Sequence, residues 1–242
     1  ADRVLTAIRL FFVFIGHVLG KGDVFMFDEK GKNVELAAAL LSAEGAAVEH
    51  DRAFDMDAEK IKEHAAGMKE VLERVITLCG TPETPREYYI CTKAYSELGD
   101  NCKAISCARA YLADSSGDLF NYTTADEDGI AVNGGEAKRA GIMMDLASAL
   151  ENTGDNEGAY HYYSEAYRLQ PYDAMAAVKC ADVIAKLNGR KEALDFLLEQ
   201  KLGGYYEPVA YTDALGEKRK NDLFKQLIDA HILKFTSDKA QN

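Results

Sequence analysis

The sequence predicts an all-α fold made of helical hairpins. Apolar residues recur at helical spacing through most of the chain, and its 242 residues include only four prolines. The clearest hairpin is residues 140–174, where two helices are joined at Asn152–Asn156 and stopped at Gln170-Pro171. Small residues stand where these helices would approach closely, at Ala147, Ala159 and Ala166. Large apolar residues are expected to fill the space around them, at Met143, Leu146, Leu150, Tyr163 and Leu169.

Residues 1–33 form the first of two predicted parts, an apolar N-terminal helix and its connection. Val4–Leu19 is the most apolar stretch, but it is shorter than the roughly 20 residues of a membrane span and contains Arg9 and His17. Such a helix is expected to be buried in the chain's own core, in a subunit interface or in lipid, with a β-strand as the remaining alternative. Its candidate interface residues are Arg9, Phe12, Gly16 and Gly20.

Residues 34–242 form the second predicted part, a helical-repeat domain. Its expected elements before the first clear hairpin are two helices, at 34–50 and Asp57–Leu78, and they follow a short strand expected at Val24–Phe27 in the connection of the first part. Gly80-Thr-Pro82 is expected to stop the second helix, because the residue before a proline is biased away from helical geometry.

An insertion interrupts the helical pattern at residues 113–135. This segment is polar and rich in glycine, and its acidic residues match the EF-hand calcium loop poorly, so a solvated or partly ordered loop is the favoured interpretation. Three further elements are expected around the hairpin of residues 140–174. A hairpin precedes the insertion at Pro85–Leu112, a second hairpin follows at Ala174–Lys201, and a final amphipathic helix is expected at Leu215–Phe235.

The charge of the chain limits its partners. The formal net charge is −12, which argues against non-specific nucleic-acid binding because that binding depends on lysines and arginines that neutralise phosphates. The same charge disfavours an anionic membrane surface as the main partner. Basic or apolar protein surfaces remain compatible with it.

The cysteines favour a reducing compartment. The chain has five, an odd number, without a CxxC pair, so reduced and mostly buried thiols are expected rather than a disulfide framework. This pattern favours a cytoplasmic location. Cys102 and Cys107 fall on different sides of a helix, and no metal site is predicted.

The central hairpin and its successor repeat with a period of 34 residues. Pairs at this offset are Ala147 and Ala181, Ala159 and Ala193, and Gly154 and Asn188. A helix–turn–helix of 34 residues is the period of the tetratricopeptide repeat, and residues 85–201 resemble that family. The central unit matches its motif at Met143, Leu146, Ala147, Leu150, Ala159, Tyr163, Ala166 and Pro171. The resemblance implies a short right-handed α–α superhelix whose last repeat is capped by the C-terminal helix.

In this family the first helices of the repeats line a concave groove. The resemblance therefore implies a peptide-binding groove formed by Arg86, Tyr89, Lys93, Met144, Ser148, Glu151, Asn152, Val178, Lys179 and Asp182. Some members clamp a terminal carboxylate with several basic residues. Here Lys93 and Lys179 are suitably placed, but Asp145 and Asp182 oppose an anion, so such a clamp is disfavoured.

The sequence offers no catalytic motif. It contains no P-loop, GxSxG, HExxH or dinucleotide fingerprint, so we expect a non-enzymatic protein without a cofactor. The run Tyr160–Tyr163 combines a packing residue with residues expected on the outer face of a second helix. The alternative function is a structural or assembly subunit that forms a homo-oligomer, or contacts a membrane, through residues 4–19.

Overall fold

The computed structural model describes residues 30, 33–34, 36–41, 58–113, 123–125, 131–207, 209–212 and 218–237. The chain divides into two compact units, Ala1–Thr81 and Pro82–Asn242, whereas the sequence placed a boundary between residues 33 and 34. The apolar helix expected at residues 4–19 and the strand expected at Val24–Phe27 lie outside the described residues. Among the helices that are described, none combines the length and apolarity needed to cross a membrane.

In the N-terminal unit, helix α3 (Ala58–Cys79) matches the helix expected to end near Leu78. Gly80 closes it with a backbone φ of 63°, and its N–H donates to the Ile76 carbonyl at 3.0 Å. A left-handed residue of this kind satisfies a carbonyl at the helix end, which glycine does without steric cost. Residues 33–34 and 36–41 are helical, in agreement with the helix expected over residues 34–50.

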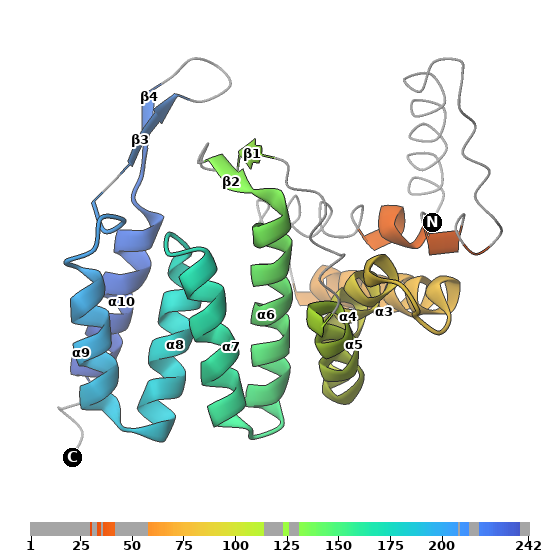
Figure 1. Ribbon diagram of the computed structural model, residues 1–242, viewed down its shortest axis with the longest axis horizontal. Coiled ribbons are helices and arrows are strands. Elements are labelled where there is room, and N and C mark those ends of the chain that lie inside the picture. Colours follow the sequence, from red (N-terminus) through yellow and green to blue (C-terminus); the bar gives the residue numbers. More distant parts are fainter. Residues whose placement is uncertain are drawn as a thin grey trace. The chain divides into compact units, whose positions relative to one another are not determined.

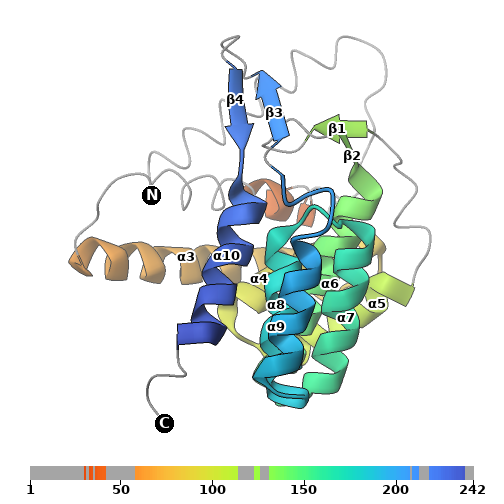
Figure 2. The ribbon, with the colours of Figure 1, turned by 90° about the vertical axis from the view of Figure 1, so that its left-hand side faces the viewer.

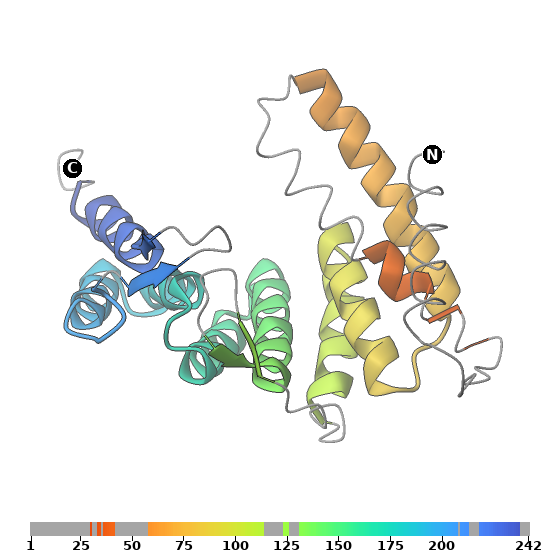
Figure 3. The same ribbon diagram turned by 90° about the horizontal axis from the view of Figure 1, so that it is seen from above.

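The C-terminal unit contains three helical hairpins and a final helix (Figure 1). The hairpins and the final helix are α4 (Pro85–Leu98) with α5 (Asn101–Ala113), α6 (Gly134–Asn152) with α7 (Asn156–Leu169), α8 (Ala174–Leu187) with α9 (Arg190–Gln200), and α10 (Leu223–Ser237). Each helix from α4 to α9 packs on the next one in the chain, and Figure 3 shows α6 to α9 nearly end-on. The expected all-α fold of stacked helical hairpins is confirmed.

Local sequence signals set the helix bounds. Thr84 and Glu87 form a capping box at the start of α4: Glu87 N donates to Thr84 Oγ1 at 3.3 Å, and Thr84 N donates to Glu87 Oε2 at 2.9 Å. Asp155 and Asp173 cap α7 and α8 by accepting backbone N–H groups of the first turn. All three hairpins turn through a glycine with positive φ, at Gly99, Gly154 and Gly189.

The repeat period is present in the structure. Helices α7 and α9 begin at Asn156 and Arg190, which are 34 positions apart. The expected small residues Ala147, Ala159 and Ala166 are at most 1% exposed, so the helices cross where no large side chain separates them. Around them the core contains the large residues Ile142, Leu146, Leu150 and Tyr163.

The C-terminal helix caps the stack, as expected, but begins later than the sequence suggested. Helix α10 packs against α8 and α9, and its buried residues Phe224, Ile228 and Phe235 join one core cluster with Val178 and Leu197 (Figure 2). The helix expected from Leu215 begins at Leu223, because the preceding residues form a β hairpin. Strand β3 (Val209–Thr212) pairs antiparallel with β4 (Lys218–Asn221), whose polar sequence could not extend the apolar face of the helix.

The insertion also contains regular structure. Strand β1 (Thr123–Ala125) pairs antiparallel with β2 (Ala131–Asn133), and α6 starts directly afterwards at Gly134. The segment expected to be a solvated or partly ordered loop therefore contains a short β hairpin in its described residues. Three-residue strands carry too little alternating pattern to be recognised in sequence.

Candidate partner-binding face

The predicted groove residues lie on the first helices of the three hairpins. Arg86, Tyr89 and Lys93 belong to α4, the set from Met144 to Asn152 belongs to α6, and Val178, Lys179 and Asp182 belong to α8. Helix α4 packs on α6, and α8 packs on α10. Four charged members of this set, Lys93, Glu151, Lys179 and Asp182, pair with charges on a neighbouring helix.

The first pair joins α4 to α6. Lys93 Nζ lies 2.7 Å from Asp145 Oδ2, and the two side chains are 30% and 22% exposed. Burial raises the pKa of Asp145, and the Lys93 ammonium offsets this only in part. Burial acts to lower the pKa of Lys93, but the contact with Asp145 outweighs it and the pKa is raised. Asp145, which we expected to repel an anionic ligand, therefore pairs with Lys93.

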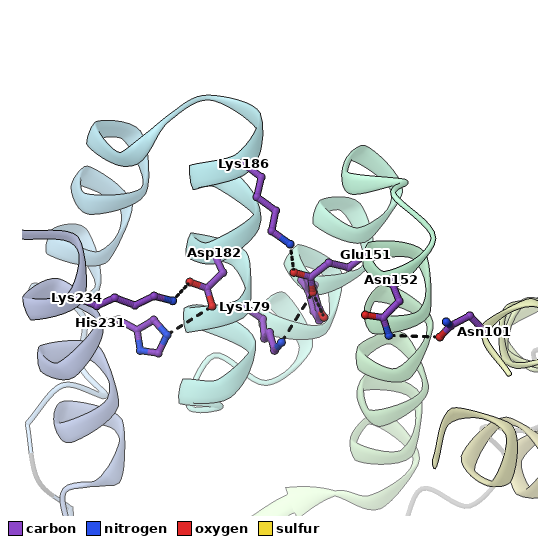
Figure 4. A network of polar contacts seen from close by, with 9 residues as sticks. Asn101, Glu151, Asn152, Lys179, Asp182, Lys186, His231 and Lys234 are labelled. Atoms are coloured by element: carbon purple, nitrogen blue, oxygen red, sulfur yellow. Dashed lines mark hydrogen bonds and ion pairs between the residues drawn. The ribbon is translucent and has the colours of Figure 1, made fainter. Parts of the chain in front are cut away.

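The second group joins α6 to α8 and centres on Glu151 (Figure 4). Lys186 Nζ donates to Glu151 Oε1 at 2.6 Å, Tyr163 Oη donates to Oε2 at 3.0 Å, and Lys179 Nζ lies 3.9 Å from Oε2. Burial acts to raise the pKa of Glu151, but Lys186, Tyr163 and Lys179 outweigh it and hold the pKa below its usual value. Glu151 is therefore an ionised, partly buried acceptor for two helices.

The third group joins α8 to α10. Lys234 Nζ donates to Asp182 Oδ1 at 2.7 Å, and His231 Nε2 lies 3.6 Å from Asp182 Oδ2 (Figure 4). Helix α10, which packs on the apolar core beside α8 and α9, thus also supplies both partners of Asp182.

These three groups form what we call the ion-pair row, which consists of Lys93, Asp145, Glu151, Lys179, Lys186, Asp182, His231 and Lys234. It connects α4 to α6, α6 to α8 and α8 to α10. Exposed ion pairs contribute about 1 kcal/mol or less each. The row therefore orients side chains along successive helices, while the apolar core supplies most of the stability.

The other predicted groove residues have mixed positions. Arg86 and Asn152 are exposed, and Asn152 Nδ2 donates to Asn101 Oδ1 at 3.4 Å. Tyr89 is half-buried with its ring centroid 5.9 Å from that of Tyr111. Met144 and Ser148 are also half-buried. Met144 packs on the core, and Ser148 hydrogen-bonds Tyr163.

Val178 departs from the expected position. It is 2% exposed and packs in the core cluster with α10, so its side chain is unavailable to a partner. The repeat pattern placed Val178 on the open face, because that pattern describes the repeats alone and not the packing of α10 against them.

Three members of the ion-pair row were missed by sequence reasoning. Lys186 lies seven residues after Lys179 on the same helix, and that spacing could have indicated a shared face. His231 and Lys234 lie on α10, which is outside the repeat, so the repeat pattern held no signal for them.

The remaining predicted site is the N-terminal interface, and no metal site was predicted. Arg9, Phe12, Gly16 and Gly20 lie outside the described residues. Within the described ranges, no group of histidine, cysteine and acidic side chains is placed to hold a metal ion. None of the five cysteines, all of which the structure describes, forms a disulfide, and Cys102 is the exposed one.

Comparisons with known proteins add little detail. Searches of family models and of curated proteins find no match. Among solved structures, eighteen chains match, and one is described as the crystal structure of MamA. It is 15% identical, with 74% of this chain and 97% of that chain covered and a TM-score of 0.39.

Proposed function

We propose that the chain is a non-enzymatic interaction module that binds a protein or peptide partner through the face carrying the ion-pair row. The observation that supports it is the arrangement of charged side chains from four helices along this face, each held in place and each still partly exposed. Side-chain exposure within the row ranges from 13% at Glu151 to 55% at Lys234.

The chemistry of the row suits a peptide chain. A lysine ammonium has three N–H donors and a carboxylate has two accepting oxygens, so one ion pair does not use the full capacity of either group. A peptide backbone offers N–H donors and carbonyl acceptors in alternation, and both kinds of partner are present along the row. Because the side chains are already oriented, binding costs less conformational entropy than it would with mobile lysines.

We further propose that residues 85–201 are a divergent tetratricopeptide array of three hairpins. The 34-residue spacing of α7 and α9 and the buried alanines at the helix crossings support this assignment. The array would present α4, α6 and α8 as the first helices that contact the partner.

The proposal is tested by reversing charge on this face. The face variant combines Arg86→Glu and Lys179→Glu, which are side chains outside the apolar core. The control combines Lys103→Glu and Lys191→Glu on the second helices α5 and α9, where the side chains are 61% and 83% exposed. Both variants change the net charge equally. Bound proteins are recovered from a lysate of the source cells and quantified by mass spectrometry, and thermal unfolding checks that both variants fold.

We expect proteins that bind the wild type and the control to be lost specifically from the face variant. Recovery of the same proteins at the same level from both folded variants would contradict the proposed binding face.

A further inference from the structure

A pocket of about 400 Å³ lies between α5, α6 and α7, away from the ion-pair row. Two arginines and a histidine line it, Arg109 from α5, Arg139 from α6 and His161 from α7. Its apolar walls include Leu112, Met143 and Tyr162. None of these residues belongs to the row, so this pocket is a separate feature of the second hairpin and its neighbour.

The charge of the pocket differs from that of the chain as a whole. Acidic residues outnumber lysine and arginine by 40 to 28, yet two arginines line this one cavity. Arg139 Nη2 donates to the Leu112 carbonyl at 3.2 Å, which fixes its guanidinium at the wall. Arg109 is exposed on the adjacent turn of α5. Arginine presents a planar set of N–H donors that matches carboxylate and phosphate oxygens.

The acid in the lining already has a cationic partner. Glu165 accepts from Arg168 Nη2 at 2.9 Å and from Arg168 Nε at 3.2 Å, and Arg168 is not part of the lining. This contact lowers the pKa of Glu165, with a smaller contribution from His161, so the carboxylate stays ionised and stays with Arg168 at neutral pH. Arg109 comes from the opposite wall, on α5.

The apolar walls restrict the ligand further. Met143 is buried, Leu112 and Tyr162 are half-buried, and the Tyr162 ring lies edge-on to that of His161 with centroids 4.9 Å apart. The cavity has the size of a small-ligand site, and apolar walls with a few fixed polar groups are typical of such sites. We propose that this pocket binds an oxyanion, a carboxylate or a phosphate, attached to an apolar group.

The test uses the full chain and three small probes of similar shape. 3-Phenylpropionate carries the carboxylate, phenyl phosphate carries the phosphate, and 3-phenylpropionamide is the neutral analogue. Each is titrated to millimolar concentration while backbone amide shifts are followed by NMR. We expect at least one anion to shift amides at the facing parts of α5, α6 and α7, with the neutral amide at least about tenfold weaker.

A matched pair of variants connects the binding to the pocket. Arg109→Gln removes one exposed guanidinium of the lining, whereas Arg190→Gln removes one exposed guanidinium on α9 outside it. Both lower the positive charge by one, so general electrostatic attraction changes equally. We expect Arg109→Gln to weaken the anion about tenfold and Arg190→Gln to leave it unchanged.

The two probes distinguish the class of ligand. Tighter binding of 3-phenylpropionate indicates carboxylates, and tighter binding of phenyl phosphate indicates phosphates. The proposal is overturned if neither anion shifts these amides, if the neutral amide binds equally well, or if Arg109→Gln and Arg190→Gln bind alike. Because the pocket shares no residue with the ion-pair row, its failure would leave the proposed binding face untouched.

Discussion

Glu151 is the residue on which the middle of the ion-pair row depends. It stands near the end of α6 and contacts Lys186 and Lys179 of α8 and Tyr163 of α7. Its side chain is 13% exposed, so much of its hydration has been exchanged for these contacts. Hydrogen bonds to an ionised group in such a setting are among the stronger polar interactions of a folded chain.

Glu151→Gln is expected to lower the free energy of unfolding by about 2 kcal/mol at pH 7. Because the folded-state pKa of Glu151 lies below its unfolded value, the ionised form contributes stability above the unfolded pKa of about 4.3. That contribution is lost progressively as pH falls from the unfolded pKa through the lower folded pKa, so the difference between wild type and variant should be smaller at pH 3 than at pH 7. Urea unfolding at both pH values measures the difference.

Glu157→Gln serves as the control, because Glu157 is exposed on α7. It should change the stability little at either pH. A deficit of Glu151→Gln that persisted unchanged at pH 3 would mean that the ionised carboxylate is not what stabilises this position.

Among the helices, α10 has two separate contacts with the repeats. One face buries Phe224, Ile228 and Phe235 against α8 and α9, and His231 and Lys234 reach Asp182 from the same helix. Asp229 of α10 is also tied to the turn that follows α9. Tyr206 Oη donates to Asp229 at 2.7 Å, and Lys201 and Lys225 hold the pKa of that carboxyl far below its usual range.

Ile228→Ala tests the apolar contact of α10. Ile228 is 0% exposed, and its truncation should destabilise the C-terminal unit by about 3 kcal/mol, since a cavity adds to the lost apolar burial. Leu233→Ala on the same helix is the control, because Leu233 is 65% exposed and should change stability by less than about 0.5 kcal/mol. Equal losses in thermal or urea unfolding would show that α10 is not packed as described.

Sequence reasoning recovered the elements whose signals are local. Capping residues, turn glycines and apolar spacing predicted the hairpins within a few residues, as at Gly99 and Asp155. It missed the strands β1 to β4, which are short and partly polar. For the candidate face it placed Lys93, Glu151, Lys179 and Asp182 on the first helices of the hairpins. It could not predict that Lys93 meets Asp145, or that Val178 is covered by α10, because these contacts depend on how separate helices pack.

For the whole molecule, the open question is the role of the apolar N-terminus. Residues 4–19 lie outside the described residues, and their sequence favours burial against protein or lipid. We expect that deleting residues 1–20 converts an oligomer to a monomer. Light scattering coupled to size exclusion, with and without detergent, measures the mass of the full and shortened chains. An unchanged oligomeric state together with unchanged partition into detergent would assign the segment to the chain's own core.

Repeat arrays have no intrinsic limit to their growth, because the end of one repeat can accept another of similar shape. At the C-terminal end of this array, α10 occupies the apolar surface of α8 and α9 and also pairs with Asp182. A second copy would have to displace both kinds of contact to add end to end. The structure therefore opposes head-to-tail polymerisation at this end.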